Sequence, residues 1–123
     1  MSNTKTAVVT GGAGFIGSHL VDALVTDGCV VHVIDNLSTG KRENVNNKAI
    51  FHEIDIVDAD MVAGVFAKLG AVDTVFHCAA MPQVQFSMEH PAETEESNVG
   101  GLVNILVEAR APFRLRGILC RLW

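Results

Sequence analysis

The chain has 123 residues, of which 49% are hydrophobic and 19% charged, and its formal net charge at pH 7 is −5. This composition is typical of one globular domain with a buried core, and it excludes a disordered chain and a collagen-like repeat. The excess of acidic over basic residues also disfavours a nucleic-acid backbone as the main partner.

The first part of the chain predicts two strands joined by a helix. Residues 5–10 are rich in β-branched side chains and stop at a pair of glycines, which is typical of a buried strand. From Phe15 the apolar residues recur at helical spacing up to Gly28, a natural C-terminal stop for a helix. Residues 29–34 form a continuous apolar run that ends at Asp35, so we expect a second strand, buried on both faces as in parallel sheets.

The rest of the chain continues this alternation of strands and helices. Pro91 suits the first turn of a helix, and the glutamates that follow it favour the positive N-terminal end. We expect, in order, a polar loop with room for one helical turn over 36–48, a strand over 49–54, a helix over 59–69, a strand over 72–78, a loop over 79–90 and a helix over 91–110.

Strands that alternate with helices predict an α/β fold, namely the N-terminal part of a Rossmann-type, doubly wound parallel sheet with right-handed crossovers. The expected strand order is 3-2-1-4. In such sheets ligands bind beyond the carboxyl ends of the strands, where the strand order reverses. That point lies between the first and fourth strands, so residues 10–17 and 78–82 are expected to form the two walls of a binding crevice.

The turn after the first strand is rich in glycine. It can be read as G-x-x-G-x-x-G, through Gly11, Gly14 and Gly17, or as G-x-G-x-x-G, through Gly12, Gly14 and Gly17. Between a strand and a helix, such glycines allow a tight turn, a close approach to a pyrophosphate, and close packing of helix on strand. Asp35 follows Gly17 by 18 residues, where a carboxylate can accept hydrogen bonds from ribose hydroxyls. The combination predicts a dinucleotide site, and the alternative is a glycine-rich turn without a ligand.

Asp35 also indicates which dinucleotide binds. An ionised carboxylate repels a 2′-phosphate by about 4 kcal/mol at ~4 Å and an effective dielectric constant of ~20. We therefore expect the cofactor to be NAD. The alternative is NADP, whose phosphate could be bound by Lys41 and Arg42 if their loop folds back toward the site.

Four segments carry a resemblance to a known family: T-G-G-A-G-F-I-G-S-H-L (10–20), D-N-L-S-T-G-K-R-E-N-V (35–45), V-F-H-C-A-A (75–80) and N-V-G-G-L-V-N-I-L (98–106). In this order and spacing they resemble the NAD-dependent epimerase/dehydratase family, the extended short-chain dehydrogenases/reductases, and within it most of all the UDP-glucose 4-epimerases. The resemblance covers residues 5–110. It implies an incomplete NAD-binding Rossmann domain over residues 1–110 and, for the full-length relative, a nucleotide-sugar substrate and a capacity to form homodimers.

The resemblance also implies which residues contact the cofactor. Gly11, Gly14, Phe15 and Ile16, with Gly17 as the last glycine of the motif, match the pyrophosphate turn; Asp35 and Asn36 match contacts to the adenosine ribose; Asp55 and Ile56 match a pair flanking the adenine; Cys78, Ala79 and Ala80 match the strand end along the cofactor; and Asn98 matches an asparagine lining the crevice. Asp55 has alternatives, which are to cap the helix over 59–69 or to lie in a polar turn with Asp58 and Asp60.

The histidines invite a catalytic interpretation because imidazole titrates near neutral pH. His77 lies on a buried strand, and there we expect a core residue whose hydrogen bonds are satisfied. The same structural interpretation applies to His19, near the start of the first helix, and to His32, in the middle of the second strand.

Neither a metal site nor a disulfide framework is expected. The three cysteines, Cys29, Cys78 and Cys120, form neither a CxxC pair nor a Cys/His ligand spacing. The apolar runs are too short to cross a membrane, and the first five residues do not begin a signal peptide. We therefore expect a cytoplasmic protein with no membrane partner.

The chemistry of the family that the chain resembles is hydride transfer between a sugar carbon and NAD, with a tyrosine as general base and a lysine four residues later that lowers the pKa of the tyrosine. This chain contains no tyrosine, and its last lysine, Lys68, precedes the fourth strand. We therefore name no catalytic residue and expect the chain by itself to be inactive. One alternative is a non-catalytic module that binds NAD or a nucleotide, or a subunit completed by a partner chain. Another is a structural domain that binds no nucleotide.

Residues 111–123 differ in character from the rest of the chain. Residues 1–109 hold all fourteen acidic residues and five basic ones, whereas residues 110–123 hold four arginines and no acidic residue. Our hypothesis is that the reading frame slips by one base near Arg110, in which case the shifted frame of the gene should continue to a Tyr-x-x-x-Lys. Since an arginine-rich tail stands where an apolar fifth strand would be expected, we predict an unpaired sheet edge beside the fourth strand.

Overall fold

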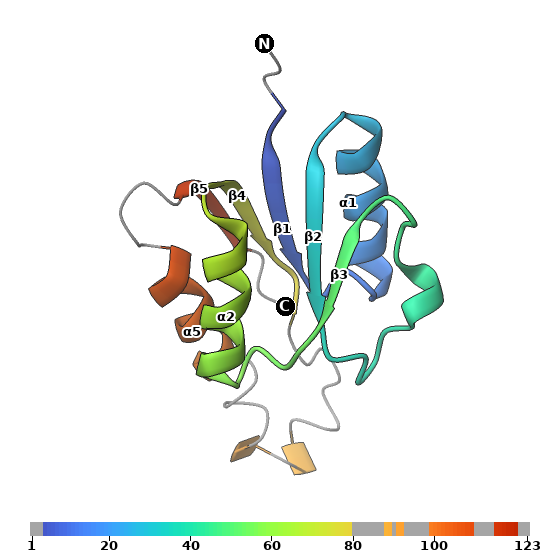
Figure 1. The fold of residues 1–123 in the computed structure, drawn as a ribbon. Coiled ribbons are helices and arrows are strands. Elements are labelled where there is room, and N and C mark those ends of the chain that lie inside the picture. The colour runs from blue at the N-terminus through green and yellow to red at the C-terminus, as the bar shows by residue number, and fades with distance from the viewer. Residues whose placement is uncertain (1–3, 80–87, 90, 93–98, 110–114, 121–123) are drawn as a thin grey trace.

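The computed structural model describes residues 4–79, 88–89, 91–92, 99–109 and 115–120. Its elements follow one another as β1 (Thr6–Thr10), α1 (Phe15–Thr26), β2 (Val30–Asp35), the single turn η1 (Arg42–Asn44), β3 (Ile50–Glu53), α2 (Ala59–Leu69), β4 (Val72–His77), α5 (Gly101–Ala109) and β5 (Leu115–Cys120) (Figure 1). The strands and helices expected up to residue 78 are confirmed to within two residues, and η1 is the helical turn expected in the polar loop. Of the helix expected over 91–110, residues 93–98 lie outside the described residues, and α5 is its C-terminal part.

The five strands form one parallel sheet in the order β3-β2-β1-β4-β5. The expected order of the first four strands is confirmed. The expectation of an unpaired edge beside β4 is wrong, because β5 pairs with β4 from Val72↔Leu115 to His77↔Cys120. A parallel ladder is made by backbone groups, so the arginine and the glycine within β5 do not prevent this pairing.

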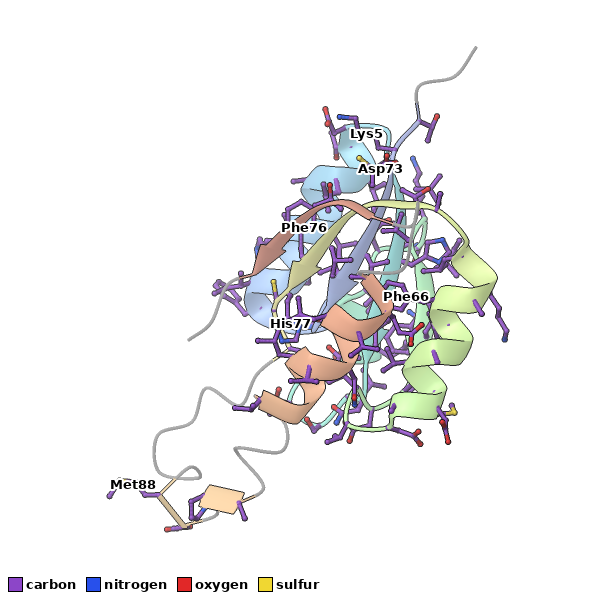
Figure 2. The ribbon with its side chains drawn as sticks, turned by 90° about the vertical axis from the view of Figure 1, so that its left-hand side faces the viewer. Lys5, Phe66, Asp73, Phe76, His77 and Met88 are labelled. Atoms are coloured by element: carbon purple, nitrogen blue, oxygen red, sulfur yellow. The ribbon has the colours of Figure 1, made fainter. Side chains whose placement is uncertain are left out.

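Helices cover both faces of the sheet, with α1 on one face and α2 and α5 on the other (Figure 1). Because successive strand residues point to opposite faces, Val8 belongs to the apolar cluster beneath α2 and α5, whereas Val9 belongs to the cluster beneath α1. The first cluster also contains Phe66 of α2, labelled in Figure 2, and Ile105 of α5, both almost fully buried. The central strand β1 is therefore buried on both faces, as its sequence predicts.

The ends of α2 show how local sequence sets the limits of a helix. The helix begins after Asp58, whose carboxylate accepts a hydrogen bond from Met61 N at 3.2 Å. It ends at Gly70, which has φ of 69°, a conformation that glycine adopts without strain. Since Asp58 is the cap, the alternative in which Asp55 caps this helix is wrong.

Candidate functional site

The carboxyl ends of β1 and β4 lie side by side, at the point where the strand order reverses. The register pairs Thr10 with His77, so the residues that follow these two strands meet. Gly11, after β1, comes against Cys78 and Ala79, after β4. The described parts of the two segments expected to flank a ligand are therefore adjacent, as the position rule for doubly wound sheets requires, while residues 80–82 lie outside the described residues.

Two glycines of the turn are required by its backbone geometry. Gly11 has φ of 72°, a left-handed conformation, and a Cβ on it would lie 2.8 Å from the backbone nitrogen of Ala79. A Cβ on Gly17 would overlap the carbonyl oxygen of Gly11. Gly14 is less crowded, since a Cβ there would meet the same oxygen at 3.4 Å, an ordinary contact. The first and last glycines of the motif thus allow β1, β4 and α1 to approach one another closely.

The first turn of α1 presents backbone N–H groups that have no acceptor among the described residues. Gly14 is the N-cap of the helix and offers no side-chain acceptor. The Ser18 N–H donates to the Gly14 carbonyl at 2.9 Å, which leaves the N–H groups of Phe15, Ile16 and Gly17. Because these groups lie at the positive end of the helix, the turn can bind an anion.

Asp35, at the end of β2, is buried and joins the glycine turn to the loop after β2. Its Oδ2 accepts a hydrogen bond from Ala13 N at 3.0 Å, and its Oδ1 accepts one from Leu37 N at 2.8 Å. Leu37 has φ of 61°, which residues other than glycine rarely adopt, and the bond to Asp35 holds it there. Since a carboxylate oxygen can accept more than one hydrogen bond, the expected ribose contacts are compatible with both bonds.

Asn36 and Asp55, which the resemblance assigns to the ribose and the adenine, lie together on the surface. Asn36 Nδ2 donates to Asp55 Oδ2 at 3.2 Å. The other carboxylate oxygen of Asp55 accepts from Val57 N at 3.0 Å, so Asp55 also lies in a polar turn. Ile56 is 7% exposed and packs closely against Gly101 of α5. A Cβ added at Gly101 would lie only 2.5 Å from Ile56 Cδ1. Its assignment to the adenine stays a prediction.

The loop between β2 and β3 folds back onto the glycine turn. Lys41 N and Asn44 Nδ2 both donate to the Ala13 carbonyl, at 3.2 and 3.1 Å. The backbone of this loop therefore folds back toward the site, which is the condition under which Lys41 and Arg42 could bind the phosphate of NADP. The Arg42 guanidinium, however, lies 4.5 Å from the centre of the Phe51 ring, in a cation–π contact. Arg42 would have to leave this contact to bind a 2′-phosphate.

Thr10 and His77 form a buried hydrogen-bonded pair across β1 and β4, and Figure 2 shows His77 at the end of β4. The Thr10 hydroxyl oxygen accepts from Cys78 N at 3.1 Å and from Ala79 N at 3.2 Å, and it lies 2.7 Å from His77 Nδ1. Since a hydroxyl has two acceptor sites and one proton, that proton is directed to Nδ1. The neutral imidazole then carries its own proton on Nε2.

The histidines fit their structural interpretation in part. His77 is 1% exposed, as expected, but its hydrogen bonds are not all satisfied, because Nε2 has no partner among the described residues. His19 lies on the exposed surface of α1, not in the core, and its Nδ1–H donates to the Phe15 carbonyl at 2.6 Å. His32 is half-buried and bonded to His52.

Burial lowers the pKa of His77, and this makes the stability of the fold depend on pH. The unfolded chain titrates this group near its ordinary value of 6.5, so below that pH the unfolded state binds more protons. The free energy of unfolding is expected to fall as the pH drops from 6.5 toward the lowered pKa, by at most about 1.4 kcal/mol per pH unit. Urea unfolding of the chain and of His77→Gln at several pH values measures this contribution. Equal pH slopes for the two proteins would contradict it.

Asn104, on α5, is a residue that sequence reasoning missed. Its Nδ2 donates to the carbonyls of Ile56 and Val57, at 2.7 and 3.1 Å, and so fastens α5 to the loop that carries Asp55. The signal was present in the sequence, because asparagine is a poor helix former. Asn98, which the resemblance assigns to the crevice, belongs to the same matched segment of the sequence.

Replacing Asn104 by alanine is expected to lower the free energy of unfolding by about 1–2 kcal/mol, since two carbonyls lose a donor. The amide protons of residues 55–57 should also exchange faster with solvent. Urea denaturation and hydrogen exchange measure the two effects, with Asn47→Ala, in the exposed loop before β3, as the control. Unchanged exchange in this loop would show that Asn104 does not hold it.

Two of the expected cofactor residues, Ala80 and Asn98, lie outside the described residues. The others lie at or directly after the carboxyl ends of β1, β2, β3 and β4, so the structure brings them to a common edge. Among the described residues, no group of three or more His, Cys, Asp or Glu side chains could hold a metal ion. No described helix is long and apolar enough to cross a membrane. The groups that the described residues bring together are the backbone N–H groups at the start of α1 and the carboxylates of Asp35 and Asp55.

Comparison with known proteins places this site in a family. The model of the NAD dependent epimerase/dehydratase family matches residues 7–117. The UDP-glucose 4-epimerase of Lacticaseibacillus casei is 40% identical over 113 residues, which are 92% of this chain and 34% of that protein. The crystal structure of UDP-glucose 4-epimerase with UDP-glucose from Thermotoga maritima has a TM-score of 0.88 and 40% identity, covering 94% of this chain and 37% of the other. That of the Thermus thermophilus enzyme in complex with NAD has a TM-score of 0.80 and 42% identity, covering 85% and 33%.

The chain spans about a third of the length of these relatives. The matched residues include the glycine turn, Asp35 and the end of β4, which are the parts of the site that the structure brings together. By its sequence and its fold, the chain belongs to the NAD dependent epimerase/dehydratase family.

Proposed function

We propose that the chain is the NAD-binding portion of a sugar-nucleotide epimerase or dehydratase similar to UDP-glucose 4-epimerase, and that the chain alone is inactive. The observation that supports this most is the bond between the Asp35 carboxylate and Ala13 N in the glycine turn. It sets a carboxylate beside the helix terminus whose N–H groups can bind a pyrophosphate. A carboxylate in this position favours the ribose hydroxyls of NAD over the 2′-phosphate of NADP.

In this function the residues of the chain bind and orient the cofactor. The N–H groups of residues 15–17 hold the pyrophosphate, Asp35 and Asn36 hold the adenosine ribose, and Asp55 lies toward the adenine. Bound NAD supplies a hydride acceptor. The family resemblance calls for a tyrosine as general base, and the chain has none, so binding without turnover is expected of it.

Replacing Asp35 by alanine is expected to weaken NAD binding about tenfold or more and to remove the preference for NAD over NADP, because the carboxylate both holds the turn and repels a phosphate. Calorimetry with the 123-residue chain measures both affinities, and circular dichroism shows whether each protein is folded. The Asp35→Asn variant, which keeps one acceptor oxygen, should give an intermediate result.

The matched control is Asp60→Ala, which removes an exposed aspartate in the first turn of α2. It should leave NAD affinity unchanged. A folded chain that does not bind NAD would contradict the proposed function. Equal affinities for NAD and NADP would contradict the role of Asp35 alone and would favour a phosphate site at Lys41.

A second candidate is a non-catalytic module that binds NAD or a nucleotide, or a subunit completed by a partner chain. The pairing of β5 with β4 favours it, because residues 115–120 of the arginine-rich tail then form the edge strand of the sheet. The first proposal instead treats residues 1–110 as the NAD-binding domain and residues 111–123 as a tail produced by a shifted frame. A downstream frame encoding Tyr-x-x-x-Lys in the gene would support the first and count against the second.

For the full-length protein we propose a nucleotide-sugar substrate, a cytoplasmic location and a homodimer. The support for a dimer is the surface of α5, where Val103 is 49% exposed, Leu106 38% and Val107 45%. Apolar side chains that gather on one exposed helix are a feature of protein interfaces. Sedimentation of the full-length protein tests this part of the proposal, and a monomer at all concentrations would contradict it.

A further inference from the structure

The hydrogen-bonded pair of Thr10 and His77 lies directly beneath the crevice between β1 and β4. His77 shares a sheet face with Val75, which belongs to the apolar cluster beneath α2 and α5 (Figure 2). The Thr10 hydroxyl oxygen receives the N–H groups of Cys78 and Ala79, the first two residues after β4. The pair is therefore attached to the chain segment that forms one wall of the crevice.

This wall is in turn packed against the glycine turn. A Cβ on Gly11 would lie 2.8 Å from Ala79 N and 2.9 Å from Ala79 Cα, so the two backbone segments touch without a side chain between them. The Gly11 carbonyl accepts a hydrogen bond from Gly14 N at 3.1 Å, and Gly14 is the N-cap of α1. A displacement of Ala79 would therefore be passed through Gly11 to the N–H groups at the start of α1.

His77 determines the direction in which the Thr10 hydroxyl points. The hydroxyl can accept the two backbone N–H groups only while its single proton is directed elsewhere, and His77 Nδ1, at 2.7 Å, receives that proton. Thr10 is 0% exposed, so water does not offer the proton another acceptor. Without Nδ1 the hydroxyl would turn and withdraw a lone pair from one N–H group. Cys78 N also donates to the Thr10 carbonyl at 3.0 Å, so Ala79 N is the group that depends on the hydroxyl.

We propose that His77 is a positioning residue of the dinucleotide site: through Nδ1 it orients the Thr10 hydroxyl, which holds Ala79 N and keeps the end of β4 against the glycine turn. This inference rests on the proposed NAD-binding function. The role requires no contact between His77 and NAD. It also makes no use of Nε2, which has no partner within the described part of the chain, so the two ring nitrogens can be tested separately.

Two amide substitutions separate the nitrogens. An asparagine can place its amide oxygen close to the position of Nδ1, whereas the amide of a glutamine, one methylene further out, lies close to the position of Nε2. Calorimetry with the 123-residue chain should show that His77→Asn binds NAD within about twofold of the native affinity and that His77→Gln binds it roughly fivefold or more weakly, because the wall is no longer preorganised. The Ala79 amide proton should exchange with solvent faster in His77→Gln than in His77→Asn.

The control is Val72→Ala, at the opposite end of β4, which removes buried apolar atoms and should lower stability without changing the NAD affinity of the folded chain. Equal NAD affinities of the two His77 variants would overturn the proposal. A loss of affinity in His77→Asn alone would also overturn it, because the role would then belong to Nε2. A folded native chain that does not bind NAD would instead refute the proposed function.

A measurement on the native chain tests the proposal even if His77→Gln does not fold. If NAD binds only while Ala79 N is held by Thr10, saturating NAD suppresses the opening of this bond, because binding and opening are linked. Hydrogen exchange of the Ala79 amide should therefore slow roughly in proportion to the NAD concentration above its Kd. The amide of Gly28, which donates to the Val25 carbonyl after α1, should exchange unchanged. An Ala79 amide whose exchange does not respond to NAD would overturn the proposal.

Discussion

Replacing Gly17 by alanine is expected to lower the free energy of unfolding by about 3 kcal/mol or more and to abolish dinucleotide binding. A Cβ on Gly17 would overlap the Gly11 carbonyl oxygen and lie 2.9 Å from Gly12 Cα. These are backbone atoms, which cannot rotate away as the end of a side chain can. The first turn of α1 must therefore move off β1, and the N–H groups of residues 15–17 move with it.

Urea denaturation measures the loss of stability, and calorimetry under conditions where circular dichroism shows a folded chain measures NAD binding. The matched control is Gly64→Ala, in the middle of α2, where a Cβ would meet no atom within 4 Å. Since alanine is the better helix former, Gly64→Ala should raise the free energy of unfolding by about 0.5–1 kcal/mol. A Gly17→Ala chain as stable as the native one would refute the close approach of α1 to the turn.

The change of Thr10 to valine, which has nearly the same shape, is expected to cost about 3 kcal/mol of stability. The hydroxyl is the acceptor for Ala79 N and the donor to His77 Nδ1, and both groups lose this partner in the variant. Cys78 N keeps a hydrogen-bond partner in the variant, because it also donates to the Thr10 carbonyl at 3.0 Å. With Nε2 already unpartnered among the described residues, the whole imidazole of His77 is then without a hydrogen bond from them.

Two measurements check this expectation. Urea denaturation gives the stability, with Thr74→Val as control, because the Thr74 hydroxyl, on the neighbouring strand β4, makes no hydrogen bond within the described part of the chain. Nitrogen chemical shifts of the His77 ring give its tautomer, which should be Nε2–H in the native chain. A ring protonated on Nδ1 would contradict the assigned direction of the bond from Thr10.

The main features of the fold could be predicted because they depend on local patterns. Continuous apolar runs indicated strands buried on both faces, and Val8 and Val9 do lie in clusters on opposite faces of β1. The glycine turn between a strand and a helix indicated the position of the site, and Asp35 is bonded to that turn as the dinucleotide pattern suggests.

The polar contacts that hold the site together could not be predicted in the same way. Thr10 and His77 are 67 residues apart in the sequence, and Asn104 is 48 residues from Ile56. Spacing along the chain carries no information on which polar side chains meet across such separations. The sequence could show that Asn104 is a poor helix former within a helix, but it could not show that the carbonyls of another loop would accept hydrogen bonds from its amide.

The ends of helices and strands were difficult to predict for a different reason, because several neighbouring residues could each cap or end the same element. Three aspartates occur between residues 55 and 60, and each could cap a helix that begins nearby. In the structure Asp58 is the cap, while Asp55 bonds to Asn36 and Val57 N. The fifth strand was missed because its arginine and glycine obscure the apolar pattern, although the backbone groups that make the ladder are unaffected.

The glycine turn is fixed from three sides before any ligand arrives. Gly11 is packed against the end of β4, Gly17 against Gly11, and Ala13 is bonded through Asp35 to the end of β2 and through its carbonyl to the η1 loop. The conformational entropy of this segment is therefore lost during folding and not during association, which is the condition of a preorganised site. Affinity for a dinucleotide should accordingly respond to a change at Asn44, which is not among the expected cofactor contacts, since its amide donates to the Ala13 carbonyl and so helps to keep the N–H groups in place.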